Sequence, residues 1–154
     1  RLYANITIPN SICFSPDAQT AYFTDTVTGK LMRVAVDPLT ALPVGEPKLF
    51  FENMGAGWID GSICDAHGNV WNARWGAGRL VCHAPDGEIV KEINIEGSPQ
   101  TSCPAFVGLS HDKMIVTSAK KLMSAEALGA APHAGKTFLI DQPVKGRPEP
   151  EVHI

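Results

Sequence analysis

The chain has 154 residues, enough for one ordinary domain with a sizeable core. A hydrophobic content of 44% and a charged content of 19% exclude a disordered chain and favour a soluble globular protein. The net charge of -3 provides no basic surface for nucleic acid or anionic membrane, and no apolar run is long enough to span a bilayer. We therefore expect neither nucleic acid nor membrane as a partner.

Short runs of β-branched and aromatic residues, separated by turns rich in Gly and Pro, predict a chain made almost entirely of strands. The runs form three units of four. In chain order they are Ile8–Phe14, Ala21–Asp25, Leu31–Val36, Lys48–Phe51; Ile59–Cys64, Val70–Ala73, Arg79–His83, Ile89–Ile95; Thr101–Val107, Met114–Thr117, Thr137–Ile140 and, weakly, Glu151–Ile154. Four strands per unit are typical of a β-propeller blade, so we predict an all-β fold with blades at about 8–51, 58–95 and 101–154.

The third unit carries an insertion from Ser118 to Gly135 that is rich in small residues. Within it, Leu122–Leu128 is the one candidate helix, with Gly129 as its predicted C-terminal cap. We interpret this helix as part of the insertion rather than as an architectural element.

Three blades do not close a propeller, because closed rings have about four to eight blades and an open arc leaves strand edges unpaired. The chain also begins abruptly, with Arg1–Asn5 resembling the tail of a preceding outer strand. We therefore expect residues 1–154 to be part of a larger ring, completed either by a missing half of the same chain or by a second chain. The isolated chain is then expected to be inactive.

The four cysteines, Cys13, Cys64, Cys82 and Cys103, lie far apart and have no spacing suited to zinc. Three of them fall within apolar runs, where a free thiol behaves as a small buried hydrophobe. This pattern predicts reduced core cysteines in a cytoplasmic protein, although sequence alone leaves disulfides open.

The main functional signal is a repeat of two stretches, Pro9–Ala18 and Ile59–Gly68, which align without a gap. The alignment places Asn10 opposite Asp60, each at the start of an inner-strand run. Two oxygen-bearing side chains at the same point of neighbouring blades can converge on one hard metal ion, such as Ca²⁺, Mg²⁺ or Mn²⁺, while Zn²⁺ stays open. Taken singly, each residue also fits an ordinary turn, as Asn beside Pro and Asp before Gly often do.

Other polar and aromatic residues favour structural roles. We expect turn stabilisation by Asp17, Asp25 and Asp65, and packing by the tryptophans, of which Trp75 is the best candidate for the channel mouth. The five histidines are scattered, so surface or structural roles are expected for them. No motif places a histidine beside Ser102 or Cys103 as a nucleophile would require.

Most of the chain resembles the gluconolactonase/regucalcin family of sugar lactonases, also called senescence-marker-protein-30-like. The segments that carry the resemblance are Ile8–Asp17, Tyr22–Thr26, Asp60-Gly61, Asp65–Trp71, Trp75–Leu80, Pro85–Gly87, Thr101–Phe106 and Val116–Ala119. The resemblance implies a six-bladed propeller about twice this length, of which this chain is similar to the C-terminal half.

The resemblance also implies a divalent metal, Ca²⁺ before Zn²⁺, Mg²⁺ or Mn²⁺, bound by Asn10 and Asp60 in the central channel. It further implies hydrolysis of a small sugar lactone, in which Asp60 is the base that activates water. The family's other metal ligands have no counterpart in this chain. The alternative is a propeller that binds metal, ligand or partner without turnover. Ser11 stands where the family usually has Gly, and it is strained there if the backbone φ is positive.

Overall fold

The computed structural model describes residues 1–149, which form three antiparallel sheets. The first sheet contains β1 (Pro9–Phe14), β2 (Thr20–Asp25), β3 (Lys30–Val36) and β4 (Pro43–Glu52). The second contains β5 (Trp58–Cys64), β6 (Val70–Trp75), β7 (Arg79–His83) and β8 (Ile89–Asn94). The third contains β9 (Thr101–Val107), β10 (Lys113–Ser118) and β11 (Phe138–Ile140).

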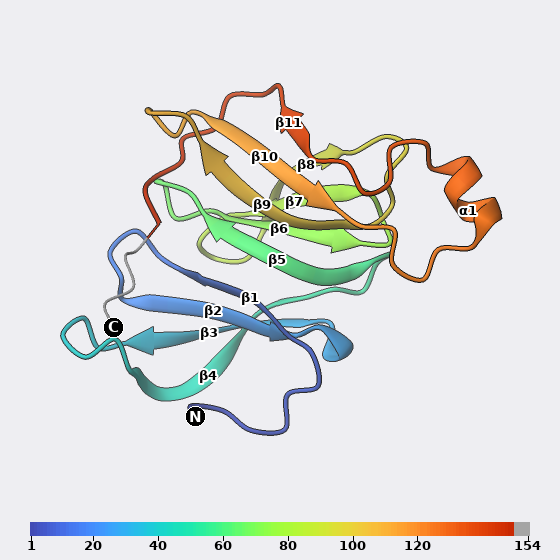
Figure 1. Cartoon of the computed structure of the whole chain (residues 1–154). Coiled ribbons are helices and arrows are strands. Elements are labelled where there is room, and N and C mark those ends of the chain that lie inside the picture. Colours follow the sequence, from blue (N-terminus) through green and yellow to red (C-terminus); the bar gives the residue numbers. More distant parts are fainter. Residues whose placement is uncertain (150–154) are drawn as a thin grey trace.

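Each sheet follows the chain in simple up-and-down order, which is the topology of a propeller blade. The first strands of the three sheets, β1, β5 and β9, lie next to one another, and the later strands fan outward (Figure 1). This arrangement confirms the prediction of an all-β fold with three propeller blades. The predicted fourth run of the third blade, Glu151–Ile154, lies outside the described residues.

The outer strand β4 is longer than predicted, because it begins at Pro43 rather than Lys48. Its first half contains Pro43, Gly45 and Pro47, which weaken a strand assignment from sequence. An edge strand accepts these residues, since its outward N–H groups need no partner within the sheet. Two irregularities in the β3–β4 pairing accompany this extension.

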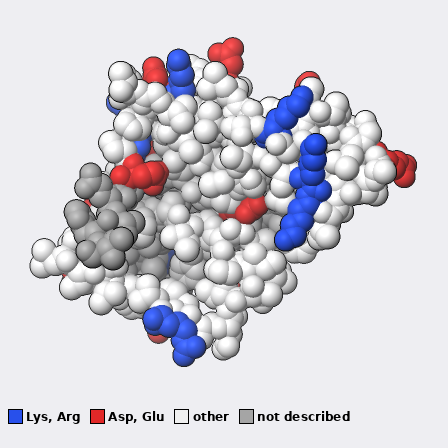
Figure 2. Space-filling model, viewed as in Figure 1, with Lys and Arg blue, Asp and Glu red and all other residues white. Residues whose placement is uncertain are grey.

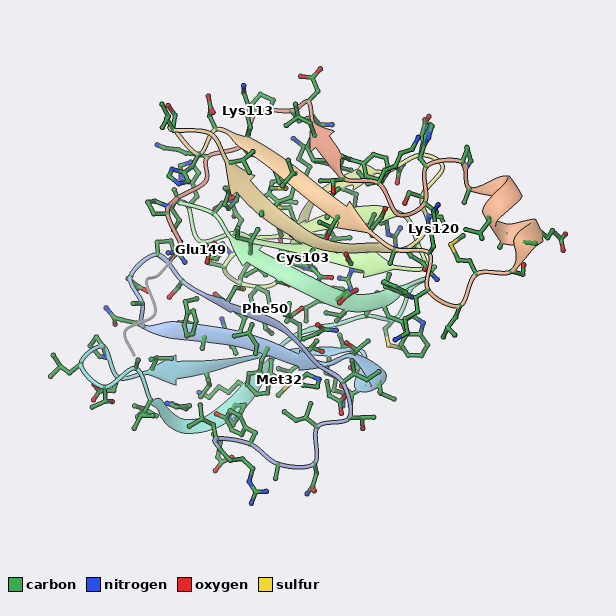
Figure 3. The ribbon with its side chains drawn as sticks, in the orientation of Figure 1. Met32, Phe50, Cys103, Lys113, Lys120 and Glu149 are labelled. Carbon is green, nitrogen blue, oxygen red and sulfur yellow. The ribbon has the colours of Figure 1, made fainter. Side chains whose placement is uncertain are left out.

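The core lies between the blades. One buried cluster joins the first and second blades and includes Leu31, Phe50 and Ile59. Phe50 comes from β4 and lies at this interface (Figure 3). A second cluster joins the second and third blades and includes Leu80 and Met114. The middle blade is therefore covered on both faces, which accounts for the nearly continuous burial of β6 and β7.

The turns use the predicted residues. Gly76 and Gly78 have positive φ angles of 87° and 60° in the hairpin between β6 and β7, where L-residues with a Cβ are disfavoured. Asp25 accepts hydrogen bonds from the N–H groups of Thr7, Ile8 and Val27. The Asp17 and Asp65 carboxylates accept hydrogen bonds from backbone N–H groups within their own turns. The Asp65 carboxylate also accepts a hydrogen bond from the Trp71 indole. The predicted structural roles of these aspartates are confirmed.

The insertion contains α1 (Ala125–Ala130), so the helix predicted at Leu122–Leu128 was placed too early. Ser124 is the N-cap, and its hydroxyl accepts a hydrogen bond from the Ala127 N–H at 3.1 Å. Gly129 lies inside the helix rather than capping it, since the helix continues to Ala130 and its C-cap is Ala131.

The four cysteines are free thiols, as predicted, and three of them are buried while Cys103 is exposed. Burial raises the pKa of the Cys64 thiol to about 12, which keeps it protonated and unreactive. None of the helices among residues 1–149 combines the length and the hydropathy of a membrane-spanning segment.

Candidate functional site

Asn10 on β1 and Asp60 on β5 line the same pocket, which has a volume of about 470 Å³. The space-filling view shows an acidic group in the hollow at the centre of this face (Figure 2). Basic side chains stand on the side of the hollow that faces α1 (Figure 2). The structure thus brings together the two residues that the sequence repeat singled out.

A β-bulge lies beside or around each of these two residues. The β1–β2 ladder shifts register between Asn10 and Cys13, and the β5–β6 ladder shifts between Ile59 and Ser62. A bulge inserts one extra residue and turns its neighbours away from the regular pleat. Asn10 is thus the last paired residue before the bulge of β1, and Asp60 lies within the bulge of β5.

The third inner strand, β9, has the corresponding bulge between Thr101 and Pro104. By register, Ser102 occupies the position that Asp60 has in β5. Its hydroxyl lies 2.7 Å from the Thr117 hydroxyl. Ser102 therefore pairs with a hydroxyl of the neighbouring strand β10.

The amide of Asn10 is oriented by a hydrogen bond to the first blade's short 3₁₀ helix, η1 (Thr26–Thr28). Asn10 Nδ2 donates to Thr26 Oγ1 at 3.0 Å, which directs the Oδ1 end of the amide away from Thr26. The Thr26 hydroxyl in turn donates to the Ile59 carbonyl of the second blade at 2.8 Å. The Thr26 hydroxyl therefore links β1, which carries Asn10, to β5, which carries Asp60.

Asp60 is half-buried, and this burial changes the pKa of its carboxyl group. Burial raises the pKa of Asp60 to about 6, and the hydrogen bond from the Gly61 N–H opposes this rise. A carboxylate with this cost of desolvation is stabilised by a nearby cation. Asp60 and the carbonyl end of Asn10 are hard oxygen donors of the type that Ca²⁺, Mg²⁺ and Mn²⁺ prefer.

The donor set is compatible with such an ion but incomplete within the described chain. Calcium takes six to eight oxygen ligands, and these two side chains supply only part of that number. Across residues 1–149, no group of three or more His, Cys, Asp or Glu side chains is arranged to hold a metal ion. Further donors must come from elsewhere if an ion binds.

The mouth of the pocket is formed by residues that are distant in sequence. Trp75, predicted as a channel-mouth residue, does line it, together with Trp58, which we had expected to pack within a blade. Trp58 is 53% exposed and lies two residues before Asp60, on the same face of β5. This spacing of two was the signal in the sequence that could have identified Trp58.

The insertion supplies the opposite wall through Lys121 and Leu122. Gln100 Nε2 donates to the Lys121 carbonyl at 2.9 Å, which holds the insertion beside the pocket. Lys120 marks the point where the chain leaves β10 for the insertion (Figure 3). No local pattern indicates that an insertion beginning 58 residues after Asp60 returns to it, so sequence reasoning missed this wall.

Comparisons with known proteins give a consistent assignment. The family model described as "SMP-30/Gluconolactonase/LRE-like region" matches residues 1–120. A protein from Rhizobium meliloti named "Putative sugar lactone lactonase" is 54% identical over 155 residues, covering 100% of this chain and 52% of its own length. An L-arabinolactonase from Azospirillum brasilense is 36% identical over 143 residues, covering 86% of this chain and 43% of its own length.

Among solved structures, the calcium-binding protein regucalcin from Agrobacterium tumefaciens superposes with a TM-score of 0.96 at 44% sequence identity. The match covers 99% of this chain and 52% of the regucalcin chain. The chain thus spans about half the length of the relatives that it matches. The family resemblance seen in the sequence motifs is confirmed, and the chain belongs to the SMP-30/gluconolactonase/LRE-like family.

Proposed function

We propose that this chain carries part of the active site of a metal-dependent hydrolase that opens a small sugar lactone. The observation that carries the proposal is the convergence of Asn10 and Asp60, from the bulged inner strands of neighbouring blades, on one pocket. The names of the Rhizobium and Azospirillum relatives, a sugar lactone lactonase and an L-arabinolactonase, support the substrate class. The Agrobacterium neighbour is called calcium-binding, which supports Ca²⁺ as the ion.

The remaining ligands would come from further blades. A three-bladed arc is open, and the relatives are about twice as long as this chain. We therefore propose a six-bladed ring in which residues 1–154 form one half and the other half belongs to the same chain or to a second one. That half would supply the oxygen ligands that Asn10 and Asp60 lack.

A bound ion would supply Lewis acidity, polarising the lactone carbonyl and stabilising the oxyanion. Asp60 acts as the general base. It accepts a proton as a water oxygen adds to the carbonyl carbon, and the ring C–O bond then breaks as the leaving oxygen takes up a proton. Burial raises the pKa of Asp60 in the metal-free chain, and a bound cation would favour the ionised carboxylate that a base requires. Asp60 can serve as both ligand and base when one carboxylate oxygen stays free.

The pocket walls suit a sugar-like substrate. Trp58 and Trp75 offer apolar ring surface to the C–H face of a sugar ring, and their indole N–H groups can meet hydroxyls. Lys121 on the opposite wall offers an ammonium group to substrate hydroxyls or to the carboxylate formed by ring opening.

The test uses what we call the complemented protein, which is this chain joined to the part of the Rhizobium meliloti relative that lies outside the match. We expect the complemented protein to hydrolyse an aldonolactone and to lose this activity on chelation. Asp60→Asn should lower kcat by about a hundredfold or more, because general base catalysis contributes roughly 10²–10⁴-fold. The matched control is Asp17→Asn, which removes an exposed turn carboxylate and should leave kcat unchanged.

Full activity of Asp60→Asn would overturn the assigned base. The second candidate function is a metal- or ligand-binding propeller without turnover, which the calcium-binding description of the Agrobacterium neighbour favours. That function predicts Ca²⁺ uptake by the complemented protein with no chelator-sensitive hydrolysis.

A further inference from the structure

Ser11 connects the two blades directly beneath the candidate ligands. Its side chain is buried, and its hydroxyl donates a short hydrogen bond to the Asp60 carbonyl. The same hydroxyl accepts from Ser62 Oγ at 2.9 Å and from Asn72 Nδ2 at 3.1 Å. One donor and two acceptor sites are the full capacity of a hydroxyl, so every one of them is used.

Ser11 holds this position in a strained backbone conformation. Its φ angle is 59°, in the left-handed region, which costs about 1–2 kcal/mol for a residue with a Cβ. Glycine at this position would avoid the strain but would have no hydroxyl. The hydrogen bonds made by the Ser11 hydroxyl therefore compensate for an unfavourable backbone conformation. A positive φ angle at a non-glycine residue next to Asn10 points toward a role in the site.

The main chain around Asp60 depends on side chains for its hydrogen bonds, because the bulge interrupts the strand ladder. Thr26 donates to the Ile59 carbonyl, and Ser11 donates to the Asp60 carbonyl. Asn72 is fully buried on β6, and its two N–H donors are shared among the Ser11 hydroxyl and the Asp60 and Gly61 carbonyls, whose oxygens lie 3.1, 3.2 and 3.3 Å from Nδ2. Three consecutive carbonyls of the second blade are thus held by polar side chains, two of which belong to the first blade.

We propose that Ser11, supported by Asn72, is a positioning residue that sets the placement of Asp60 relative to Asn10. Ser11 adjoins Asn10 in the chain and binds the Asp60 main chain, so a single side chain spans both candidate ligands. The proposal rests on the proposed function, in which these two residues bind one divalent cation. Neither Ser11 nor Asn72 is assigned contact with the ion or the substrate.

Two substitutions separate the hydroxyl from the backbone strain. Ser11→Ala removes the hydroxyl and keeps the strained Cβ, whereas Ser11→Gly removes both. If the hydroxyl positions the site, both variants of the complemented protein should bind Ca²⁺ about ten- to a hundredfold more weakly in isothermal titration calorimetry, as is typical for groups that orient metal ligands. Their thermal stabilities should diverge, with Ser11→Gly unfolding at the higher temperature.

The matched control is Thr101→Val. The buried Thr101 hydroxyl donates across the other blade interface, to the Arg74 and Arg79 carbonyls at 3.1 and 3.2 Å. Its loss should lower stability without weakening Ca²⁺ binding. Wild-type Ca²⁺ affinity in both Ser11 variants would overturn the proposal. Weaker Ca²⁺ binding in Ser11→Ala alone would also overturn it, because Ser11→Gly lacks the hydroxyl too, and the effect would then come from the strained Cβ.

A second readout keeps this test separate from the proposed function. The side-chain amide NMR signals of Asn10 in the metal-free complemented protein should shift in both Ser11 variants and stay in place in Thr101→Val. Unchanged Asn10 signals in the Ser11 variants would overturn the positioning role. Absence of Ca²⁺ binding by the unsubstituted protein would instead count against the metal site, while the NMR comparison would still decide the role of Ser11.

Discussion

Gly61 lies where the inner strand of the second blade passes very close to that of the third. A Cβ atom at this position would lie 2.7 Å from both Cys103 Sγ and the Ser102 carbonyl oxygen. Such contacts require β9 to move, because the carbonyl belongs to its backbone. The sequence motif Asp60-Gly61 was open to interpretation as a turn, but the glycine is required by this close approach of two strands.

We expect Gly61→Ala to destabilise the protein by about 1–3 kcal/mol, the usual cost of overpacking. Urea denaturation midpoints would measure the change. Gly129→Ala is the matched control, since nothing lies within 4 Å of its added Cβ and the residue is helical, so this variant should be stabilised by up to about 1 kcal/mol. Equal midpoints for Gly61→Ala and the unsubstituted chain would contradict the close approach.

At single residues, the sequence was informative about residue type and position in the repeat. It identified Asn10 and Asp60 as candidate ligands because both carry oxygen at the same point of two aligned stretches. It could not identify Thr26 or Ser11 as the groups that orient them. A serine or threonine hydroxyl has no sequence signature for a bond to another blade, and the strain at Ser11 became evident only with its φ angle.

At the scale of secondary structure, the contact between the first two blades contains a buried histidine. His83 on β7 is fully buried, with Nε2 3.0 Å from Arg74 Nη2 and Nδ1 3.2 Å from the Gly87 carbonyl. The Phe51 ring of β4 lies 4.2 Å from the imidazole, between ring centroids. The neutral ring therefore donates through Nδ1 and accepts through Nε2, and protonation would oppose the bond from Arg74.

Burial, with the adjacent Arg74 charge, lowers the pKa of His83 to about 4 from its ordinary 6.5. Between pH 6.5 and 4 the unfolded chain binds a proton here that the folded chain does not, so this contribution to stability is lost as pH falls. We expect the free energy of unfolding, relative to His83→Gln, to decrease by about 3 kcal/mol across this window.

The comparison with His83→Gln is needed because Asp60, whose pKa is raised, changes stability in the opposite direction as pH falls. Both proteins contain Asp60, so its contribution cancels. Urea titrations at pH 4 and pH 7 provide the measurement. A difference between the two proteins that does not vary with pH would show that His83 titrates normally.

Strands were more predictable than the other elements. Short apolar runs between Gly and Pro turns are a local signal, and they located strands such as β7 and β9 at their observed bounds. The helix was displaced, because it starts at the Ser124 cap and continues through Gly129 instead of ending before it. The extra length of β4 depends on its place at a sheet edge, which is not a local property.

At the scale of the whole molecule, apolar side chains are exposed on the outer faces of the first and third blades. On the first blade, Ile12 is 67% exposed and lines an apolar hollow of about 400 Å³ with Phe14 and Phe23. On the third blade, Leu139 is 62% exposed. Apolar sheet faces of this kind pack against further blades in a closed propeller.

We expect the 154-residue chain, expressed alone, to associate in a concentration-dependent manner and to lack lactonase activity. Light scattering after gel filtration would measure the association. Ile12→Lys should reduce it by placing a charge on the open face, whereas Leu109→Lys, in the exposed turn between β9 and β10, should not. A compact monomer with full activity would contradict both the incomplete site and the open ring.

The blade pattern, the family and the two candidate ligands could be read from the sequence, because strand runs, turn residues and the match between two stretches are visible along the chain without knowing which residues touch. The side chains that orient those ligands, and the wall that faces them, became evident only from the folded structure. Ser11 and Thr26 act across the interface to the second blade, and Lys121 returns to the pocket from the insertion. These contacts join residues 33 to 61 positions apart, and only blade packing brings such residues together.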